Sequence, residues 1–243
     1  LTTKPKKDIC FQHLTNITAL KIKLKTFLQH QDFACNICLC FCINKPMKSK
    51  NVFVDKDVII GRNVKIEDNV KLVGNCKIGD DVVIKSNSCL TDVVVENGCE
   101  IDSSVISKAN IGKGCKIGPF SNIRPNCIIS DNVKIGAFVE LKNAYVGKNT
   151  KIPHLAYVGD AEIGENVNIG CGVVFANYDG KVKQKSKIGD NVFIGCNVNI
   201  VAPVNIADNT YICAGTTVTN DTENGDFVIG RVRQENKKGI KKR

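Results

Sequence analysis

The side chain with the clearest catalytic potential in this chain is His154. It is the one histidine of a long repetitive segment, whereas His13 and His30 lie near the start of the sequence. An imidazole titrates close to neutral pH and is therefore an efficient general base. A catalytic zinc site takes three protein ligands, and the repetitive segment offers no second histidine. The sequence thus favours proton transfer by His154 without a metal, with an ordinary surface histidine as the alternative.

A polar insertion follows His154 along the chain. Residues 176–187 read ANYDGKVKQKSK and interrupt the repeat between Phe175 and Ile188. Asn-Tyr-Asp-Gly is a strong turn signal, and the seven residues after it contain four lysines. Loops on a rigid scaffold often carry binding and catalytic residues. We therefore expect an extruded basic loop that shares a groove with His154.

The elements that must position these residues follow a six-residue period. Large apolar residues recur at every sixth position in three trains: Val54, Ile60, Ile66, Leu72, Ile78, Ile84 and Leu90; Ile111, Ile117, Ile123, Ile129, Ile135 and Leu141; and Ile188, Ile194, Ile200, Ile206, Ile212 and Val218. Such a period predicts an all-β fold, a parallel β-helix in which each repeat is one short strand and a turn. Three repeats form a triangular coil, so residues 52–218 should make about nine coils, and we expect them to be left-handed. The steps from Leu90 to Val95 and from Leu141 to Val146 are one residue short, as if a corner residue were deleted.

The positive charge of the chain lies at its two ends. The formal net charge is +10, of which residues 1–50 contribute +7 and residues 231–243 contribute +6, so the central part is slightly acidic. A nucleic-acid-binding body would be basic itself. The absence of Trp and the 6% aromatic content suit a narrow interior of stacked Ile, Val and Leu. The composition therefore does not favour a nucleic-acid partner.

Most of the thirteen cysteines are best interpreted as small apolar residues. Four of them occupy the inward small-residue position of the repeat, namely Cys76, Cys99, Cys115 and Cys127. A free cysteine behaves as a small buried hydrophobe, which suits a reducing cytosol. Cys35 and Cys38 have the spacing of half a zinc site, but no second pair follows them.

The chain divides by pattern into three parts. Residues 1–50 form a non-repeat leader, partly disordered or helical, with an amphipathic stretch around residues 20–28; residues 51–230 form the β-helix domain; and residues 231–243 form a basic tail. No segment resembles a signal peptide, and the longest apolar stretch, residues 33–43, is much shorter than the roughly 20 residues of a membrane span. We expect a cytoplasmic protein without a membrane partner, and the first residue, Leu1, suggests a fragment of a longer chain.

One part of the sequence resembles a known family. From residue 117 to residue 234 the chain contains, in order, IGPFSNIRP, VELKNA, HLAYVGDAEIGENVNIG, ANYDG, KIGDNVFIG, VAPV, AGTTVT and GRVRQ. These phrases resemble the C-terminal acetyltransferase half of the bifunctional N-acetylglucosamine-1-phosphate uridyltransferase / glucosamine-1-phosphate acetyltransferase family, a hexapeptide-repeat acyltransferase. Nothing in the first 50 residues resembles the Gly-rich nucleotidyltransferase half of that family.

The resemblance implies a role for each matching residue. It implies that His154 is the general base, that Arg124 and Lys142 hold the sugar phosphate, and that Lys183 is a further substrate-side lysine. Sugar hydroxyls would be bound by Tyr157 and Asn168. Acetyl-CoA would be bound by Asn177, Tyr178, Cys171, Cys196, Ala214 and Arg231, the last through the phosphates of coenzyme A. Cys171 and Cys196 stand where the family commonly has Ala and Ser, and their contacts there are largely through the backbone.

The resemblance also implies the reaction and the assembly. Acetyl would pass from acetyl-CoA to the 2-amino group of glucosamine 1-phosphate in a homotrimer with active sites between subunits, and no metal would take part. Backbone N–H groups near the corner at residues 170–172 would stabilise the oxyanion. A nucleophilic role for Cys171 or Cys196 is a rival without an evident histidine partner. Two further alternatives are another hexapeptide acyltransferase with a different amine or hydroxyl acceptor, and a non-catalytic truncated scaffold.

Overall fold

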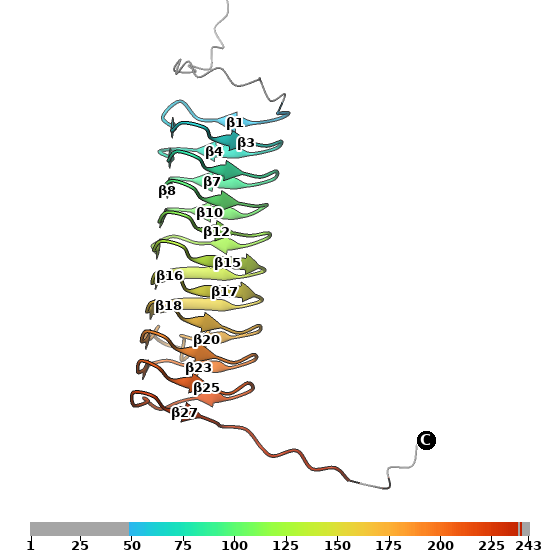
Figure 1. The fold of residues 1–243 in the computed structure, drawn as a ribbon, viewed down its shortest axis with the longest axis vertical. Coiled ribbons are helices and arrows are strands. Elements are labelled where there is room, and N and C mark those ends of the chain that lie inside the picture. Colours follow the sequence, from blue (N-terminus) through green and yellow to red (C-terminus); the bar gives the residue numbers. More distant parts are fainter. Residues whose placement is uncertain (1–48, 238, 240–243) are drawn as a thin grey trace, which may run out of the picture. The chain divides into compact units, whose positions relative to one another are not determined.

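The computed structural model describes residues 49–237 and 239. Within them every regular element is a short β-strand, and no helix occurs. The strands stack as flat triangular coils from β1 (Phe53–Val54) to β27 (Phe227–Val228), as Figure 1 shows. The predicted parallel β-helix of hexapeptide repeats is confirmed. The Cys35–Cys38 motif and the amphipathic stretch of the predicted leader lie outside the described residues.

Each coil contributes one strand to each of three faces, which we name after their first strands. The β1 face contains β1, β4 (Lys71–Val73), β7 (Cys89–Thr91), β10 (Val105–Ser107), β13 (Asn122–Ile123), β20 (Val174–Ala176), β23 (Asn199–Val201) and β26 (Thr217–Val218). The β2 face contains β2 (Ile59–Ile60), β5 (Lys77–Ile78), β8 (Val94–Val95), β11 (Ala109–Ile111), β14 (Cys127–Ile129), β21 (Ser186–Ile188) and β24 (Val204–Ile206). Two longer strands, β16 (Glu140–Val146) and β18 (Tyr157–Ile163), turn the corner and belong to both of these faces.

The β3 face is a separate ten-stranded parallel sheet. It contains β3 (Lys65–Ile66), β6 (Val83–Ile84), β9 (Glu100–Ile101), β12 (Lys116–Ile117), β15 (Lys134–Ala137), β17 (Lys151–His154), β19 (Asn168–Ile169), β22 (Phe193–Ile194), β25 (Tyr211–Ile212) and β27. One strand per coil corresponds to about ten coils, one more than predicted. The coils continue beyond Val218, the last position of the third train, because β27 still pairs with β25 after a spacer that breaks the six-residue period.

Backbone hydrogen bonds between coils fix the register. Phe53 pairs with Lys71, so the first coil is 18 residues long, and the amide of Phe53 donates to the carbonyl of Val70 at 2.9 Å. The two predicted one-residue deletions are confirmed, because the coils that contain them are shorter than 18 residues. The register shows three more steps of five residues, from Ile101 to Ile106, from Ile106 to Ile111 and from Val158 to Ile163.

The interior is a stack of apolar columns, and most faces of a coil bury one large and one small residue, as Ile84 and Val82 do. Its largest fully buried side chain is Phe175, the last inward residue before the insertion. The four cysteines predicted to fill the small-residue position are all buried and free. Cys115 donates its thiol to the carbonyl of Ser130 at 3.0 Å, and its contact with Cys99 together with burial raises the pKa of Cys115. All four side chains are therefore part of the apolar core.

Residues 49–237 contain no helix of the length and apolarity that a membrane span requires.

The two isoleucines of β14 offer a matched test of the core. Ile129 is 2% exposed, whereas its neighbour Ile128 is 50% exposed on the same strand. Ile129→Ala should lower the free energy of unfolding by about 2–5 kcal/mol, because it removes buried methylenes and leaves a cavity. Ile128→Ala should change it by less than about 0.5 kcal/mol. Chemical denaturation followed by circular dichroism measures both, and equal losses in the two variants would contradict the inward columns.

Candidate active site

The insertion leaves the solenoid between β20 and β21. Ile163 pairs with Ile188, so this coil is 25 residues long and the extra residues form a loop over residues 177–185. The carboxylate of Asp179 accepts the backbone N–H groups of Lys181 and Val182 at 2.8 Å each, which lowers the pKa of Asp179. The extruded turn expected from Asn-Tyr-Asp-Gly is confirmed.

Three cations gather at the corner between the β1 and β2 faces. Arg124, Lys142 and Gly159 are equivalent positions of consecutive coils, and the loop brings Lys183 to the same place. The close Lys183 ammonium, with smaller effects of burial and of Arg124, holds the pKa of Lys142 below its usual value. Arg124 forms an ion pair with Glu140 at 2.8 Å. The crowding of like charges makes this corner a ready site for an anion.

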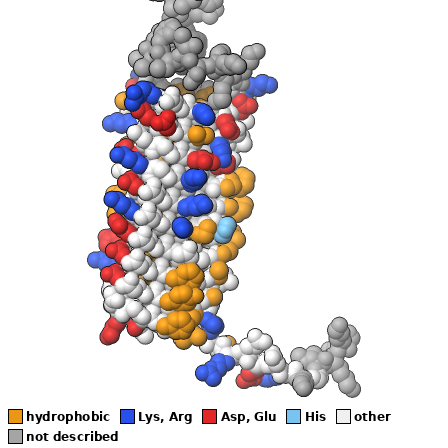
Figure 2. Space-filling model, in the orientation of Figure 1, with side chains coloured by type: hydrophobic (Ala, Val, Ile, Leu, Met, Phe, Trp, Pro, Cys, Tyr) orange, Lys and Arg blue, Asp and Glu red, His pale blue; other side chains and the backbone are white. Residues whose placement is uncertain are grey.

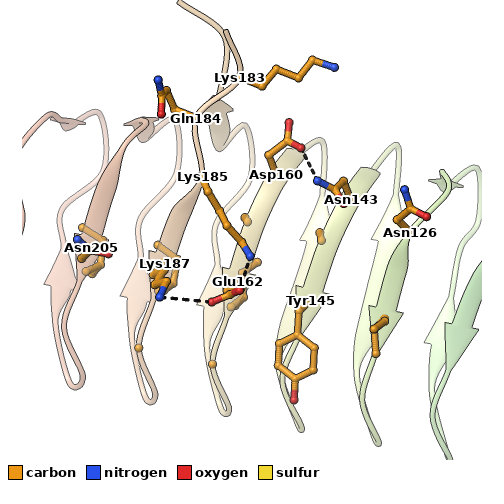
Figure 3. Close-up of a pocket in the computed structure, with 18 residues that line it drawn as sticks. Asn126, Asn143, Tyr145, Asp160, Glu162, Lys183, Gln184, Lys185, Lys187 and Asn205 are labelled. Carbon is orange, nitrogen blue, oxygen red and sulfur yellow. Dashed lines mark hydrogen bonds and ion pairs between the residues drawn. The ribbon is translucent and has the colours of Figure 1, made fainter.

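Asp160 ties the loop to this corner. Its carboxylate accepts a hydrogen bond from the side-chain amide of Asn143 at 2.6 Å (Figure 3). It also accepts one from the side-chain amide of Asn177, the first residue of the loop. Beside it, a Cβ on Gly159 would lie 2.5 Å from the hydroxyl oxygen of Tyr157 and 2.7 Å from the amide nitrogen of Asn177. Only glycine lets these two side chains converge over the strand. Sequence reasoning did not assign Asp160 or Asn143, although Asp160 lies inside the HLAYVGDAEIGENVNIG phrase.

A groove of about 950 Å³ runs under the loop on the β2 face (Figure 3). Two of its lysines, Lys185 and Lys187, form ion pairs with Glu162, which lowers the pKa of Glu162. Among the described residues Lys183 has no acidic partner within ion-pair distance. Of the residues predicted from the sequence, this groove contains only Lys183. This groove thus lies beside the cationic corner and does not include His154.

His154 lies at a different corner, where the β3 face turns into the β1 face. It is the last residue of β17, it is exposed, and no described residue hydrogen-bonds its imidazole. A groove of about 370 Å³ on the β3 face ends at His154 and is lined also by Lys116, Lys134 and Pro153. Gly136 also lines this groove, and only glycine fits there because a Cβ would collide with the carbonyl oxygen of Pro153.

The corner of His154 continues through the next three coils as one column. His154, Cys171, Cys196 and Ala214 each directly precede a corner residue with positive φ. The stacked backbones are hydrogen-bonded from coil to coil, for example from the amide of Asn197 to the carbonyl of Cys171 at 2.8 Å. Arg231 closes the column, because its guanidinium donates to the carbonyl of Ala214 at 2.9 Å. Asn168, on β19, is half-buried on the adjoining β3 face.

The predicted site residues therefore form two separate groups in one chain. Arg124, Lys142, Lys183 and Asn177 belong to the cationic corner, and Tyr157 leans toward it from the β1 face, while Tyr178 is an exposed residue of the loop. His154, Asn168, Cys171, Cys196, Ala214 and Arg231 belong to the other corner. Within one coil His154 precedes Gly159 by five residues of mostly extended chain, roughly 16 Å, so one face of the solenoid separates the groups.

Residues 49–237 contain no group of three His, Cys, Asp or Glu side chains that could hold a metal ion. The backbone narrows the expectation that N–H groups near residues 170–172 stabilise the oxyanion. The amides of Gly170 and Gly172 already donate, to the carbonyls of Ile194 at 2.8 Å and Leu155 at 3.0 Å. Within residues 170–172 the amide of Cys171 has no backbone acceptor among the described residues, and the same holds for its equivalents Cys196 and Ala214 in the next coils.

A rigid parallel solenoid with an exposed histidine on one corner column and an extruded loop defines a hexapeptide transferase architecture. The family model "Bacterial transferase hexapeptide (six repeats)" matches residues 57–92, 108–143, 143–177 and 185–220. These segments cover more than half of the sequence, and the chain belongs to this family.

Individual relatives are similar over most of this chain. The bifunctional protein GlmU of Clostridium novyi is 48% identical over 199 residues, which are 79% of this chain and 44% of that protein. The protein of the same name from Listeria monocytogenes is 47% identical over 193 residues, which are 79% of this chain and 42% of that protein. The chain thus spans less than half the length of these relatives. A solved UDP-N-acetylglucosamine acyltransferase from Bacteroides fragilis is more distant, with 20% identity and a TM-score of 0.40 over 72% of this chain and 68% of its own.

The cationic corner predicts a measurable coupling between two lysines. Lys183→Ala should raise the pKa of Lys142 toward the usual lysine value, because the repelling ammonium is removed. At a fixed pH Lys142 should then react more slowly with an amine-modifying reagent, as followed by peptide mass spectrometry. Lys185→Ala is the matched control from the same loop, because Lys185 is neutralised by Glu162. An unchanged rate at Lys142 in Lys183→Ala would show that the two ammonium groups are not neighbours.

Proposed function

We propose that this chain transfers acetyl from acetyl-CoA to the 2-amino group of glucosamine 1-phosphate, giving N-acetylglucosamine 1-phosphate. The observation that carries the proposal is the corner column in which His154 stands directly above Cys171, Cys196, Ala214 and Arg231. A base at one end of the column and a cation at the other suit a long donor with a thioester at its head and phosphates at its tail. The resemblance to the acetyltransferase half of the bifunctional family supports the same assignment.

His154 supplies the proton transfer that the acceptor needs. The sugar amine is mainly ammonium at neutral pH and cannot attack until it is deprotonated, and an imidazole is suited to take this proton. The amine nitrogen then attacks the thioester carbonyl carbon and forms a tetrahedral oxyanion. The backbone N–H of Cys171, one coil beyond His154, has no backbone acceptor and can donate a hydrogen bond to that oxygen. When the C–S bond breaks, the thiolate of coenzyme A leaves and takes up a proton, so no covalent enzyme intermediate is required.

The cationic corner suits the phosphate of the acceptor. Arg124, Lys142 and Lys183 repel one another while the corner is empty, and a phosphate dianion between them would relieve that repulsion. The guanidinium of Arg124 offers a fork of donors, and Glu140 holds it in place at 2.8 Å. This arrangement favours an acceptor with a phosphate over a neutral sugar.

Two copies of the chain would complete one site. His154 lies on one corner together with the column of Cys171, Cys196, Ala214 and Arg231, which we name the donor column. The cationic corner is the next corner of the solenoid. A rigid solenoid cannot bend these corners together, whereas a neighbouring copy can bring its cationic corner to the His154 corner of the first. A cyclic trimer repeats this pairing three times and leaves no corner unused, and we propose this assembly.

A thiol-release assay tests the reaction. Protein mixed with acetyl-CoA should release free thiol when glucosamine 1-phosphate is added. Release should be much slower with glucosamine, which lacks the phosphate, and with galactosamine 1-phosphate, in which one hydroxyl has the opposite configuration. Release with another amine or hydroxyl acceptor alone would replace the proposed substrate. No release with any acceptor, from protein that binds acetyl-CoA and is oligomeric by sedimentation, would indicate a non-catalytic scaffold.

His154→Ala separates chemistry from binding. The variant should lose about 10²–10⁴-fold in kcat because no base takes the amine proton. The Kd for acetyl-CoA, measured by calorimetry, should stay near the wild-type value, because the donor lies along the column beyond His154. The exposed imidazole has no described hydrogen-bond partner, so the variant should fold normally. Full kcat in His154→Ala would refute the proposed mechanism.

A further inference from the structure

A ladder of stacked aromatic rings lies exposed on the β3 face near the end of the solenoid. Phe193, Tyr211 and Phe227 pair in register in consecutive coils. The ring centroids of Phe193 and Tyr211 are 4.6 Å apart and those of Tyr211 and Phe227 are 5.5 Å apart, with interplanar angles of 12° and 14°. Figure 2 shows hydrophobic side chains gathered on this face toward the C-terminal end. The three rings of this aromatic ladder are exposed, and none of them belongs to the cationic corner or to the donor column.

The ladder ends in an uncovered ring. The fraction of each residue that is exposed rises along the stack, from 37% at Phe193 to 44% at Tyr211 and 67% at Phe227. Phe227 belongs to β27, and no described strand follows it, so one face of its ring has no aromatic neighbour. A stack of parallel rings that stops in solvent can be extended by one more flat ring.

The position of the ladder relates it to the donor column. Phe193 and Tyr211 each lie three residues before a member of that column, Cys196 and Ala214, and Phe227 lies four residues before Arg231. From Asn168 to Phe227 the β3 face rises three coils, roughly 15 Å at the usual strand spacing. The uncovered ring is therefore at the end of the column that carries the cation, away from His154.

We propose that the adenine ring of acetyl-CoA stacks on the exposed face of Phe227, a subsite that rests on the proposed function. Of the two proposed substrates only acetyl-CoA contains a flat aromatic ring, and every purine presents a π-face for stacking. In this pose the thioester lies at His154, the pantetheine arm follows the corner past Cys196, and the phosphates lie near Arg231. The guanidinium of Arg231 is held across this corner by the carbonyl of Ala214 at 2.9 Å.

Donors with and without the adenine test the subsite. Phe227→Ala should raise the KM for acetyl-CoA about tenfold, within the range that base–aromatic stacking contributes, and leave kcat unchanged. The KM for S-acetylpantetheine, which has no adenine, should not change. Phe227→Trp should restore the acetyl-CoA value because it keeps a flat ring. Phe53→Ala, which removes an exposed ring (52% exposed) from the first coil, is the matched control and should behave as wild type.

If the protein is active, three outcomes would overturn the proposal. An equal rise in KM for both donors would show that Phe227 acts on the fold or on the pantetheine arm. An unchanged KM for both donors would show that the adenine does not bind to Phe227. A smaller species in sedimentation of Phe227→Ala would assign the ladder to a second copy of the chain. If wild type shows no turnover, the proposed function fails by itself. Binding of adenosine 3′,5′-bisphosphate then decides the subsite: loss in Phe227→Ala supports it, and unchanged binding overturns it.

Discussion

The register between successive coils is the constraint on which the rest of this structure depends. Each strand hydrogen-bonds to its equivalents in the neighbouring coils, as Ile117 does with Ile135 and Ile101 on the β3 face. Since side chains alternate between inside and outside, a slip of one residue would turn an apolar column outward. Buried Ile, Val and Leu therefore lock every outward column as well. The donor column, the cationic corner and the aromatic ladder are all consequences of this lock, because each consists of residues one coil apart.

The loop shows how the solenoid tolerates an insertion. The core resumes at once, since Phe175 and Ile188 are both buried on either side of the loop. Asp160 closes the base of the loop through Asn177, and Asp179 closes its tip through two backbone amides. The loop can then bring Lys183 over Lys142, a placement of two like charges that the strands alone could not produce. The insertion adds a side chain to the site without disturbing the columns that hold the others.

The sequence predicts features that repeat and misses those that depend on which corner a residue occupies. The period of six identified the inward columns, the buried cysteines and the loop, because each is a local departure from or match to one pattern. It missed β27, because the spacer before Phe227 hides the last strand. It also placed His154 and the extruded loop along one groove, although within one chain Lys183 of the loop and His154 line different grooves. The amides of Gly170 and Gly172 illustrate the same limit, since their acceptors belong to another coil.

The separation of the two corners has a physical consequence for how a site can be built on this scaffold. A triangular coil is too narrow for its own side chains to enclose a substrate, because every outward column faces solvent or another molecule. Arg124 and Lys142 are held in place by strands, and so is His154, so neither group can move toward the other within one chain. Enclosure then requires a second surface, and in the proposed assembly a second copy of the same chain would supply the missing corner. The rigidity that makes the solenoid easy to recognise from its sequence thus links its proposed chemistry to its assembly.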